Sequence, residues 1–134
     1  KKFFNMGIEI NDTNNGNVLS SLPDNITQLQ KLKSIDVNYV KFLNPDLEMT
    51  KICRLTNLEV ITAEKIGLTH LPKEIINLKR VKEFSLIGNA ITALPLEIRG
   101  MKKLRKLWLS ENPIEKNELN KIKKLITKCE IIYL

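Results

Sequence analysis

The residues that could support chemistry are few and far apart in the sequence. The single histidine, His70, stands beside Leu71-Pro72 in a predicted loop, and no serine or cysteine is placed to serve as a nucleophile for it. We therefore expect His70 to be a surface residue. Cys53 and Cys129 are 76 residues apart, and neither belongs to a Cys-x-x-Cys pair. We therefore expect both to be free thiols that are buried as small apolar side chains, and not to form a metal site or a disulfide framework.

The glycines and carboxylates form no motif typical of a cofactor or metal site. A phosphate-binding loop needs closely spaced glycines, but the five glycines are scattered, at positions 7, 16, 67, 88 and 100. The carboxylates are spread singly, without the spacing of a calcium or magnesium site. The sequence therefore predicts no catalytic residues, no metal and no cofactor.

The charge balance limits the choice of partner. The 134 residues include 22 Lys and Arg against 15 Asp and Glu, which gives a formal net charge of +7. Such an excess can bind nucleic acid or another anionic surface, but it is also typical of a solvated lysine-rich exterior, which we favour. No apolar run approaches the roughly 18 residues that a membrane helix needs. We expect a globular chain without a membrane span.

A repeat sets the positions of the elements. The stretch "LPKEI" at residues 71–75 returns as "LPLEI" at residues 94–98, 23 residues later. Self-similarity at a fixed period is typical of stacked supersecondary units. The longer pattern L-x-x-L-x-L-x-x-N-x-L matches residues 81–91 and 104–114 in full, residues 58–68 and 32–42 with the asparagine replaced, and a degenerate copy around Ile8.

Each unit predicts one short strand and one helical turn. The L-x-L part has period 2, as in a strand, and the P-x-E-I-x-x-L part has period 3 to 4 with proline in the first turn. The predicted strands centre on Ile8, Ile35, Ile61, Phe84 and Leu107, with steps of 27, 26, 23 and 23 residues. We expect loops to absorb the two longer steps, namely "NDTNNGNV" (11–18) and "NPDLEMT" (44–50).

The pattern resembles the leucine-rich-repeat family, in particular the 23-residue type LPxxIxxLxxLxxLxLxxNxL of intracellular Ras-associated proteins and of bacterial proteins, including those of pathogens. The resemblance implies an α/β solenoid, a curved right-handed coil with a parallel β-sheet on the concave face and short helical turns on the convex face. It implies a single domain over residues 1–134, with about five repeats. Residues 115–134 would form a C-terminal cap, an amphipathic helix followed by a final strand in "CEIIYL".

Two asparagines have a predicted structural role. Asn89 and Asn112 would turn their amides inward and bond the backbone where the chain leaves the strand. The corresponding residues in the earlier repeats, Val40 and Ile66, cannot do this, so we expect those repeats to be less regular. At the other end, Lys1 and Lys2 would discourage strand addition beside the first strand.

The residues between the inward leucines define the concave face, because side chains alternate across a strand. Its middle column is Glu9, Asp36, Thr62, Ser85 and Trp108, and the flanking columns are Gly7, Ser34, Val60, Glu83 and Lys106 on one side and Asn11, Asn38, Glu64, Ile87 and Ser110 on the other. This face carries a formal charge of −3, so the remainder of the chain carries +10.

Trp108 is the leading candidate for binding on this face. Leu107 and Leu109 take the inward positions, so Trp108 points outward unless the C-terminal cap covers it. Exposed tryptophan is enriched at binding hot spots. The predicted protein-binding residues are Trp108, Ile87, Val60, Glu64, Glu83, Asp36, Ser85, Thr62 and Lys106.

Three functions are considered. The first is a non-enzymatic module that binds an unidentified protein ligand on the concave face as a monomer, without a small-molecule substrate or nucleic acid. The second is anion binding by a basic ridge, which consists of Lys79, Arg80, Lys82, Lys102, Lys103 and Arg105. The third is the recognition part of a longer enzyme. We expect a bacterial protein that is secreted or exposed on the surface, with the cytoplasm as the alternative location.

Overall fold

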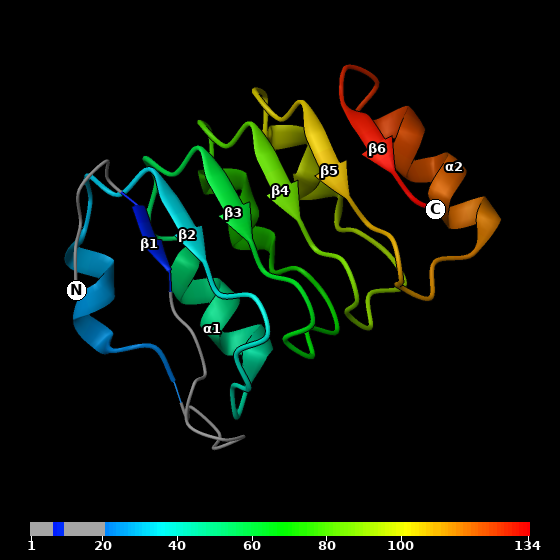
Figure 1. Ribbon diagram of the computed structural model, residues 1–134. Helices are drawn as coiled ribbons and strands as arrows, with labels where there is room; N and C mark the ends of the chain where they lie inside the picture. The colour runs from blue at the N-terminus through cyan, green and yellow to red at the C-terminus, as the bar shows by residue number, and fades with distance from the viewer. Residues whose placement is uncertain (1–6, 10–20) are drawn as a thin grey trace.

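The computed structural model describes residues 7–9 and 21–134. It contains a six-stranded parallel sheet in which the strands are ordered as in the sequence, and the helices lie on one side of it (Figure 1). The strands are β1 (Gly7–Glu9), β2 (Ser34–Asp36), β3 (Val60–Thr62), β4 (Glu83–Ser85), β5 (Lys106–Trp108) and β6 (Glu130–Ile132). This confirms the predicted solenoid with its parallel sheet.

The register of the sheet confirms the predicted strand centres. Each of them pairs with the next, and the row continues into the cap as Ile8, Ile35, Ile61, Phe84, Leu107 and Ile131. Ile61, Phe84 and Leu107 are fully buried. The two longer steps therefore leave the pairing unchanged, and the extra residues of the second step, 44–50, lie outside the strands.

The convex turns are 3-10 helices, each entered through a proline. They are η2 (Asp24–Gln28), η3 (Lys73–Asn77) and η4 (Leu96–Gly100), which follow Pro23, Pro72 and Pro95. The prolines have extended ψ values of 140° to 159°, so each stands just before its turn and not within the first turn as predicted. Each turn buries one isoleucine, which is Ile26, Ile75 or Ile98. The outward residue of the last turn, Leu96, is 63% exposed.

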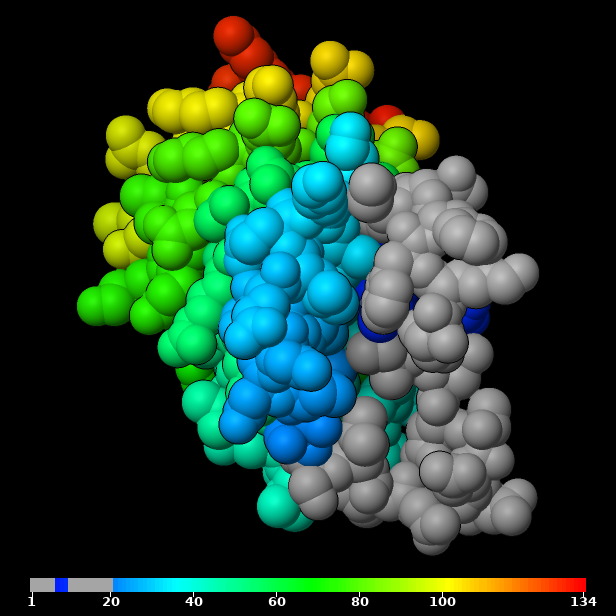
Figure 2. All heavy atoms as spheres, turned by 90° about the vertical axis from the view of Figure 1, so that its left-hand side faces the viewer, coloured from blue at the N-terminus to red at the C-terminus, as the bar shows by residue number. Residues whose placement is uncertain are grey.

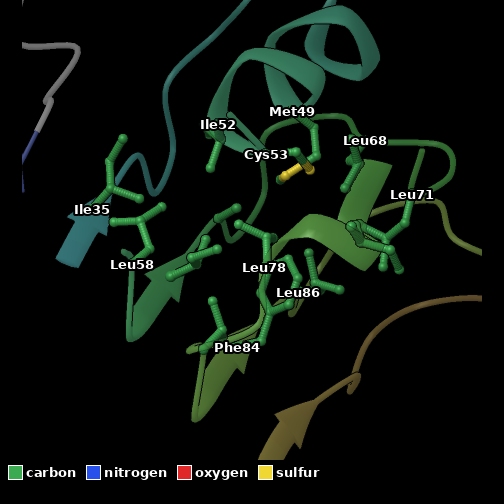
Figure 3. Close-up of a cluster of buried hydrophobic side chains, with 14 of the residues drawn as sticks. Ile35, Met49, Ile52, Cys53, Leu58, Leu68, Leu71, Leu78, Phe84 and Leu86 are labelled. Carbon is green, nitrogen blue, oxygen red and sulfur yellow. The ribbon is translucent and has the colours of Figure 1, made fainter. Parts of the chain in front are cut away.

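The segment 44–50, which we expected to be a loop, is instead the start of an α-helix. Helix α1 (Pro45–Ile52) begins with the Asn44 side chain accepting a hydrogen bond from the Leu47 N–H, and proline occupies its first position. Met49 and Ile52 are buried against the core, as Figure 3 shows together with Cys53. The prediction was wrong because the turn-forming residues Asn44 and Pro45 also start helices.

A buried ion pair attaches α1 to the preceding repeat. Glu48 is buried, and its Oε1 accepts a hydrogen bond from the Leu22 N–H at 2.7 Å. The same oxygen lies 3.2 Å from Lys51 Nζ, which also donates to the Leu22 carbonyl at 3.1 Å and lies 3.7 Å from Asp24 Oδ1.

Figure 2 looks at the N-terminal end of the solenoid, where the segment around η2 and β2 lies in blue and cyan with later repeats behind it.

The chain leaves four of the strands through a left-handed residue at the same place. These residues are Tyr39 (φ 66°), Lys65 (φ 54°), Gly88 (φ 76°) and Glu111 (φ 61°). Only one of the four is glycine, which adopts positive φ without a Cβ penalty. The sequence alone did not reveal this shared conformation.

The C-terminal cap is confirmed as a helix and a strand. Helix α2 (Lys116–Leu125) buries Ile122, and Ile126 just after it is also buried. Strand β6 then pairs with β5. The Tyr133 hydroxyl donates to the Asn112 carbonyl at 2.6 Å and lies 3.2 Å from the Ile114 carbonyl, which ties the cap to the last full repeat. At the other end, Lys1, Lys2, Asn11 and the loop 11–18 lie outside the described residues.

Candidate functional site

A shallow pocket lies on the concave face across β3, β4 and β5. Its volume is about 180 Å³, and its lining residues are Val60, Ile61, Thr62, Glu64, Glu83, Ser85, Ile87 and Trp108. Seven of the nine predicted protein-binding residues line it. The pocket forms here because the pairing of Val60 with Glu83 and of Thr62 with Ser85 brings residues of different repeats side by side.

Trp108 stands at one side of the pocket. Its side chain points away from the core, since Leu107 and Leu109 are fully buried, and it is only partly exposed. Lys106 Nζ lies 5.6 Å from the centroid of the indole ring, within the range of a cation–π contact. Strand β6 places Ile132 beside Trp108 in the register. The cap therefore borders the tryptophan without removing it from the pocket.

The polar residues of the pocket differ in how well they are satisfied. Ser85 is buried, with 4% of its surface exposed, and its hydroxyl donates to Glu64 Oε2 at 2.5 Å. The Thr62 hydroxyl oxygen is buried and has no hydrogen-bond partner in the part of the chain that the structure describes. A buried polar atom without a partner carries a free-energy cost, so such atoms in a native protein need an explanation.

Two predicted site residues lie outside the pocket. Asp36 is in β2, where its Oδ1 accepts a hydrogen bond from the Asn38 N–H at 2.9 Å, so it supports the turn after that strand. Asn38 in turn accepts from the Glu64 N–H through Oδ1 at 2.7 Å. Lys106 does not line the pocket, but its ammonium group lies over the Trp108 ring at the edge of the site.

A solved structure identifies the fold. The protein LIC12759 of Leptospira interrogans, a leucine-rich-repeat (LRR) protein, superposes on this chain with a TM-score of 0.77 and 37% sequence identity, over 86% of this chain and 29% of that one. The chain belongs to the leucine-rich-repeat family.

A curated protein is also similar in sequence. The probable inactive serine/threonine-protein kinase roco10 of Dictyostelium discoideum is 32% identical over 129 residues, which is 78% of this chain and 5% of that protein. No protein-family model matches the chain. The chain thus spans less than a third of either protein. The LRR fold is that of a protein-interaction module and is typically non-enzymatic.

The two LRR asparagines occupy the predicted structural positions. Asn89 Oδ1 accepts hydrogen bonds from the N–H groups of Ile66 and Leu68, and its Nδ2 donates to the carbonyls of Ala63 and Leu86. Asn112 Oδ1 accepts from the N–H of Ile91, and its Nδ2 donates to the carbonyls of Leu86, Leu109 and Ser110. Both asparagines are buried, and each links two adjacent repeats.

A cluster on the surface around His70 was not predicted. The Thr69 hydroxyl contacts both His70 Nδ1, at 2.9 Å, and Asp46 Oδ2, at 2.5 Å. Partial burial raises the pKa of Asp46, but the hydrogen bonds from Thr69 and the nearby His70 outweigh it, so the pKa lies below its ordinary value. His70 and Thr69 are exposed, and both Thr69 and Asp46 approach the same ring nitrogen. The arrangement therefore lacks the relay of a catalytic triad and instead links α1 to the next repeat.

The basic ridge runs along the segments before the strands. All six of its residues are exposed. Glu59 lies among them, with its carboxylate oxygens 3.9 Å from both Lys33 Nζ and Lys82 Nζ.

Among the described residues, the structure contains no group of three or more histidine, cysteine or acidic side chains that could hold a metal ion. No helix in this part of the chain has the length and apolarity needed to cross a bilayer.

Proposed function

We propose that this LRR chain is a non-enzymatic module that binds a protein ligand on its concave face. The observation that carries the proposal is the pocket around Trp108, in which an indole ring, two aliphatic side chains and two carboxylates of three adjacent repeats converge. A partly exposed aromatic anchor beside apolar side chains is typical of a binding hot spot. The pocket is smaller than the roughly 300–1,000 Å³ of small-molecule sites, which favours a protein side chain as its occupant.

A random-peptide display library tests the proposal without a known partner. Peptides would be selected in parallel on the wild-type chain and on Trp108→Ala, with Leu96→Ala as a control on the convex side. We expect peptides that bind the wild type and the control but not Trp108→Ala. If every selected peptide binds all three proteins equally well, the concave face is not the binding face.

The second candidate is anion binding by the basic ridge, which the exposure of all six of its residues supports. Phosphate contacts make affinity fall steeply as salt rises, so a titration of a short duplex DNA or of heparin at two salt concentrations tests this candidate.

The third candidate, the recognition part of a longer enzyme, is supported by the small share of each similar protein that the chain spans. Sequencing the complete gene tests it.

The location of the protein is also a proposal. We propose a bacterial protein that is secreted or surface-exposed and contacts a host. The bacterial source of LIC12759 supports the bacterial origin alone, and roco10 comes from a eukaryote. Fractionation of the source cells with an antibody against the chain distinguishes surface, secreted and cytoplasmic pools.

A further inference from the structure

The size of the concave pocket indicates a single side chain as its occupant. Its volume of about 180 Å³ is close to the roughly 150 Å³ of an apolar cavity that holds one benzene molecule. The pocket is open to solvent on the concave face, so an occupant can enter from a partner's surface without a rearrangement of the repeats.

The walls of the pocket suit a side chain with an aliphatic stem and a cationic end. Val60 and Ile87 provide apolar surface, and Trp108 provides an aromatic ring. Lys106 Nζ lies 5.6 Å from the centroid of that ring, so the indole already attracts one cation.

The polar groups of the pocket favour a cationic occupant. Glu64 and Glu83 both line it, and within residues 7–9 and 21–134 neither forms a salt bridge. Even with Lys106 counted, the formal charge around the pocket is negative. Thr62 also lines the pocket, but its hydroxyl oxygen is buried, so the two carboxylates are the acceptors that an occupant can reach. Covering these carboxylates with an apolar side chain would remove their charge from water without a cationic partner, which is costly.

We infer that the pocket takes an arginine side chain of the protein ligand, an inference that rests on the proposed function. The planar guanidinium can stack on an indole and donate several hydrogen bonds to carboxylates. Lysine has the charge and the stem but not the planar fork, so it fits less well. An acidic side chain would be repelled by Glu64 and Glu83.

The sole tryptophan makes the test direct, because all indole fluorescence of the protein arises at Trp108. The probe is the capped peptide acetyl-Leu-Arg-Leu-amide, titrated to about 10 mM and compared with its citrulline and lysine counterparts. Citrulline keeps the shape of arginine but has no charge. We expect a saturable change with the arginine peptide, at least about tenfold weaker binding of the citrulline peptide, since hydrogen bonds to charged groups contribute about that factor or more, and intermediate binding of the lysine peptide.

Three variants test the pocket itself. Glu64→Gln keeps an acceptor for the Ser85 hydroxyl, and both it and Glu83→Gln should weaken the arginine peptide by about fivefold to tenfold. The exposed Glu74→Gln on η3 is the matched control and should leave the affinity unchanged. Lys106→Gln removes a competing cation and should strengthen binding by a few-fold, an increase that a merely damaged fold would not produce. Circular dichroism verifies that each variant is folded.

Other outcomes overturn the inference. Equal affinities for the arginine and citrulline peptides, equal effects of Glu64→Gln, Glu83→Gln and Glu74→Gln, or no saturable change up to 10 mM would each do so. The proposed function is judged separately by the library selection. Peptides that depend on Trp108 but contain no arginine would leave that function standing and remove the arginine, whereas a failure to find any such peptide would remove both.

Discussion

Asn89 illustrates how much of the repeat depends on one buried amide. It makes four hydrogen bonds to the backbone of two adjacent repeats. Asn89→Ala should lower the free energy of unfolding by about 2–5 kcal/mol, because several buried backbone groups lose their partners. The exposed Asn77 is the matched control, and Asn77→Ala should cost less than about 0.5 kcal/mol. Urea unfolding measures both, and similar losses would show that the asparagine ladder does not hold the turns.

Two leucines test the orientation of the strands. Leu107 is fully buried, whereas Leu96 is 63% exposed on the convex side. Leu107→Ala should destabilise the protein by about 2–5 kcal/mol through the cavity it leaves, and Leu96→Ala by less than about 1 kcal/mol. Thermal and urea unfolding give both values. Equal losses would contradict the alternation on which every concave-face assignment depends.

We expect the two cysteines to react slowly with a disulfide reagent, at a rate that depends on pH. Both are free; burial is the main reason that the pKa of Cys53 rises to about 12 and that of the partly buried Cys129 to about 11. At pH 8 only about one Cys129 in a thousand is a thiolate, so labelling by a disulfide reagent should be slow and rise about tenfold per pH unit up to pH 10. Cys53 should react only after denaturation. A gain of two protons on reduction would show a disulfide instead.

At the scale of elements, the attachment of α1 gives the sharpest prediction. Glu48→Ala removes the partner of the Leu22 N–H and of Lys51. It should cost about 3 kcal/mol, at the lower end of the cost of breaking a buried ion pair, because Lys51 keeps Asp24 nearby. The fully exposed Asp24, as Asp24→Ala, is the control and should leave stability unchanged. Hydrogen exchange should show faster exchange of the Leu22 amide in Glu48→Ala, and protection equal to wild type would contradict the proposed attachment.

Most elements of the solenoid could be predicted because the repeat is a local signal. The L-x-L spacing gave the five repeat strands and their register, and the apolar spacing after Glu115 gave α2. Helix α1 could not be predicted in this way, since it lies between matched units and its buried residues Glu48, Met49 and Ile52 include a charge. Its stability comes from contacts with the preceding and the following repeat, which sequence spacing does not encode.

The candidate site was predicted less completely than the fold. Alternation along the strands placed Trp108, Ile87 and Val60 on the concave face, where the structure has them. The same rule could not show that Ser85 is buried and donates to Glu64, or that the Thr62 hydroxyl is left without a partner among the described residues. Those properties depend on side-chain contacts between repeats.

At the scale of the whole molecule, charge is distributed unevenly. Strand β6 adds Glu130 beside Lys106, which changes the formal charge of the concave face from −3 to −4. The basic ridge lies along the segments before the strands and is exposed. Such an asymmetry orients a charged partner during approach and affects association rates more than the fold. A cationic protein surface should therefore approach the concave face, and an anion the ridge.

The affinity of a peptide selected on the wild-type chain tests the central claim most directly. Its Kd would be measured by calorimetry on the wild type, on Trp108→Ala and on the triple variant Lys102→Ala, Lys103→Ala, Arg105→Ala, each at 50 and 300 mM NaCl. Binding on the concave face predicts that Trp108→Ala weakens binding about thirtyfold or more, the effect of losing about 2 kcal/mol from a hot spot, while the triple variant stays within about twofold of the wild type. The reverse order, with loss of binding in the triple variant and none in Trp108→Ala, would contradict the account.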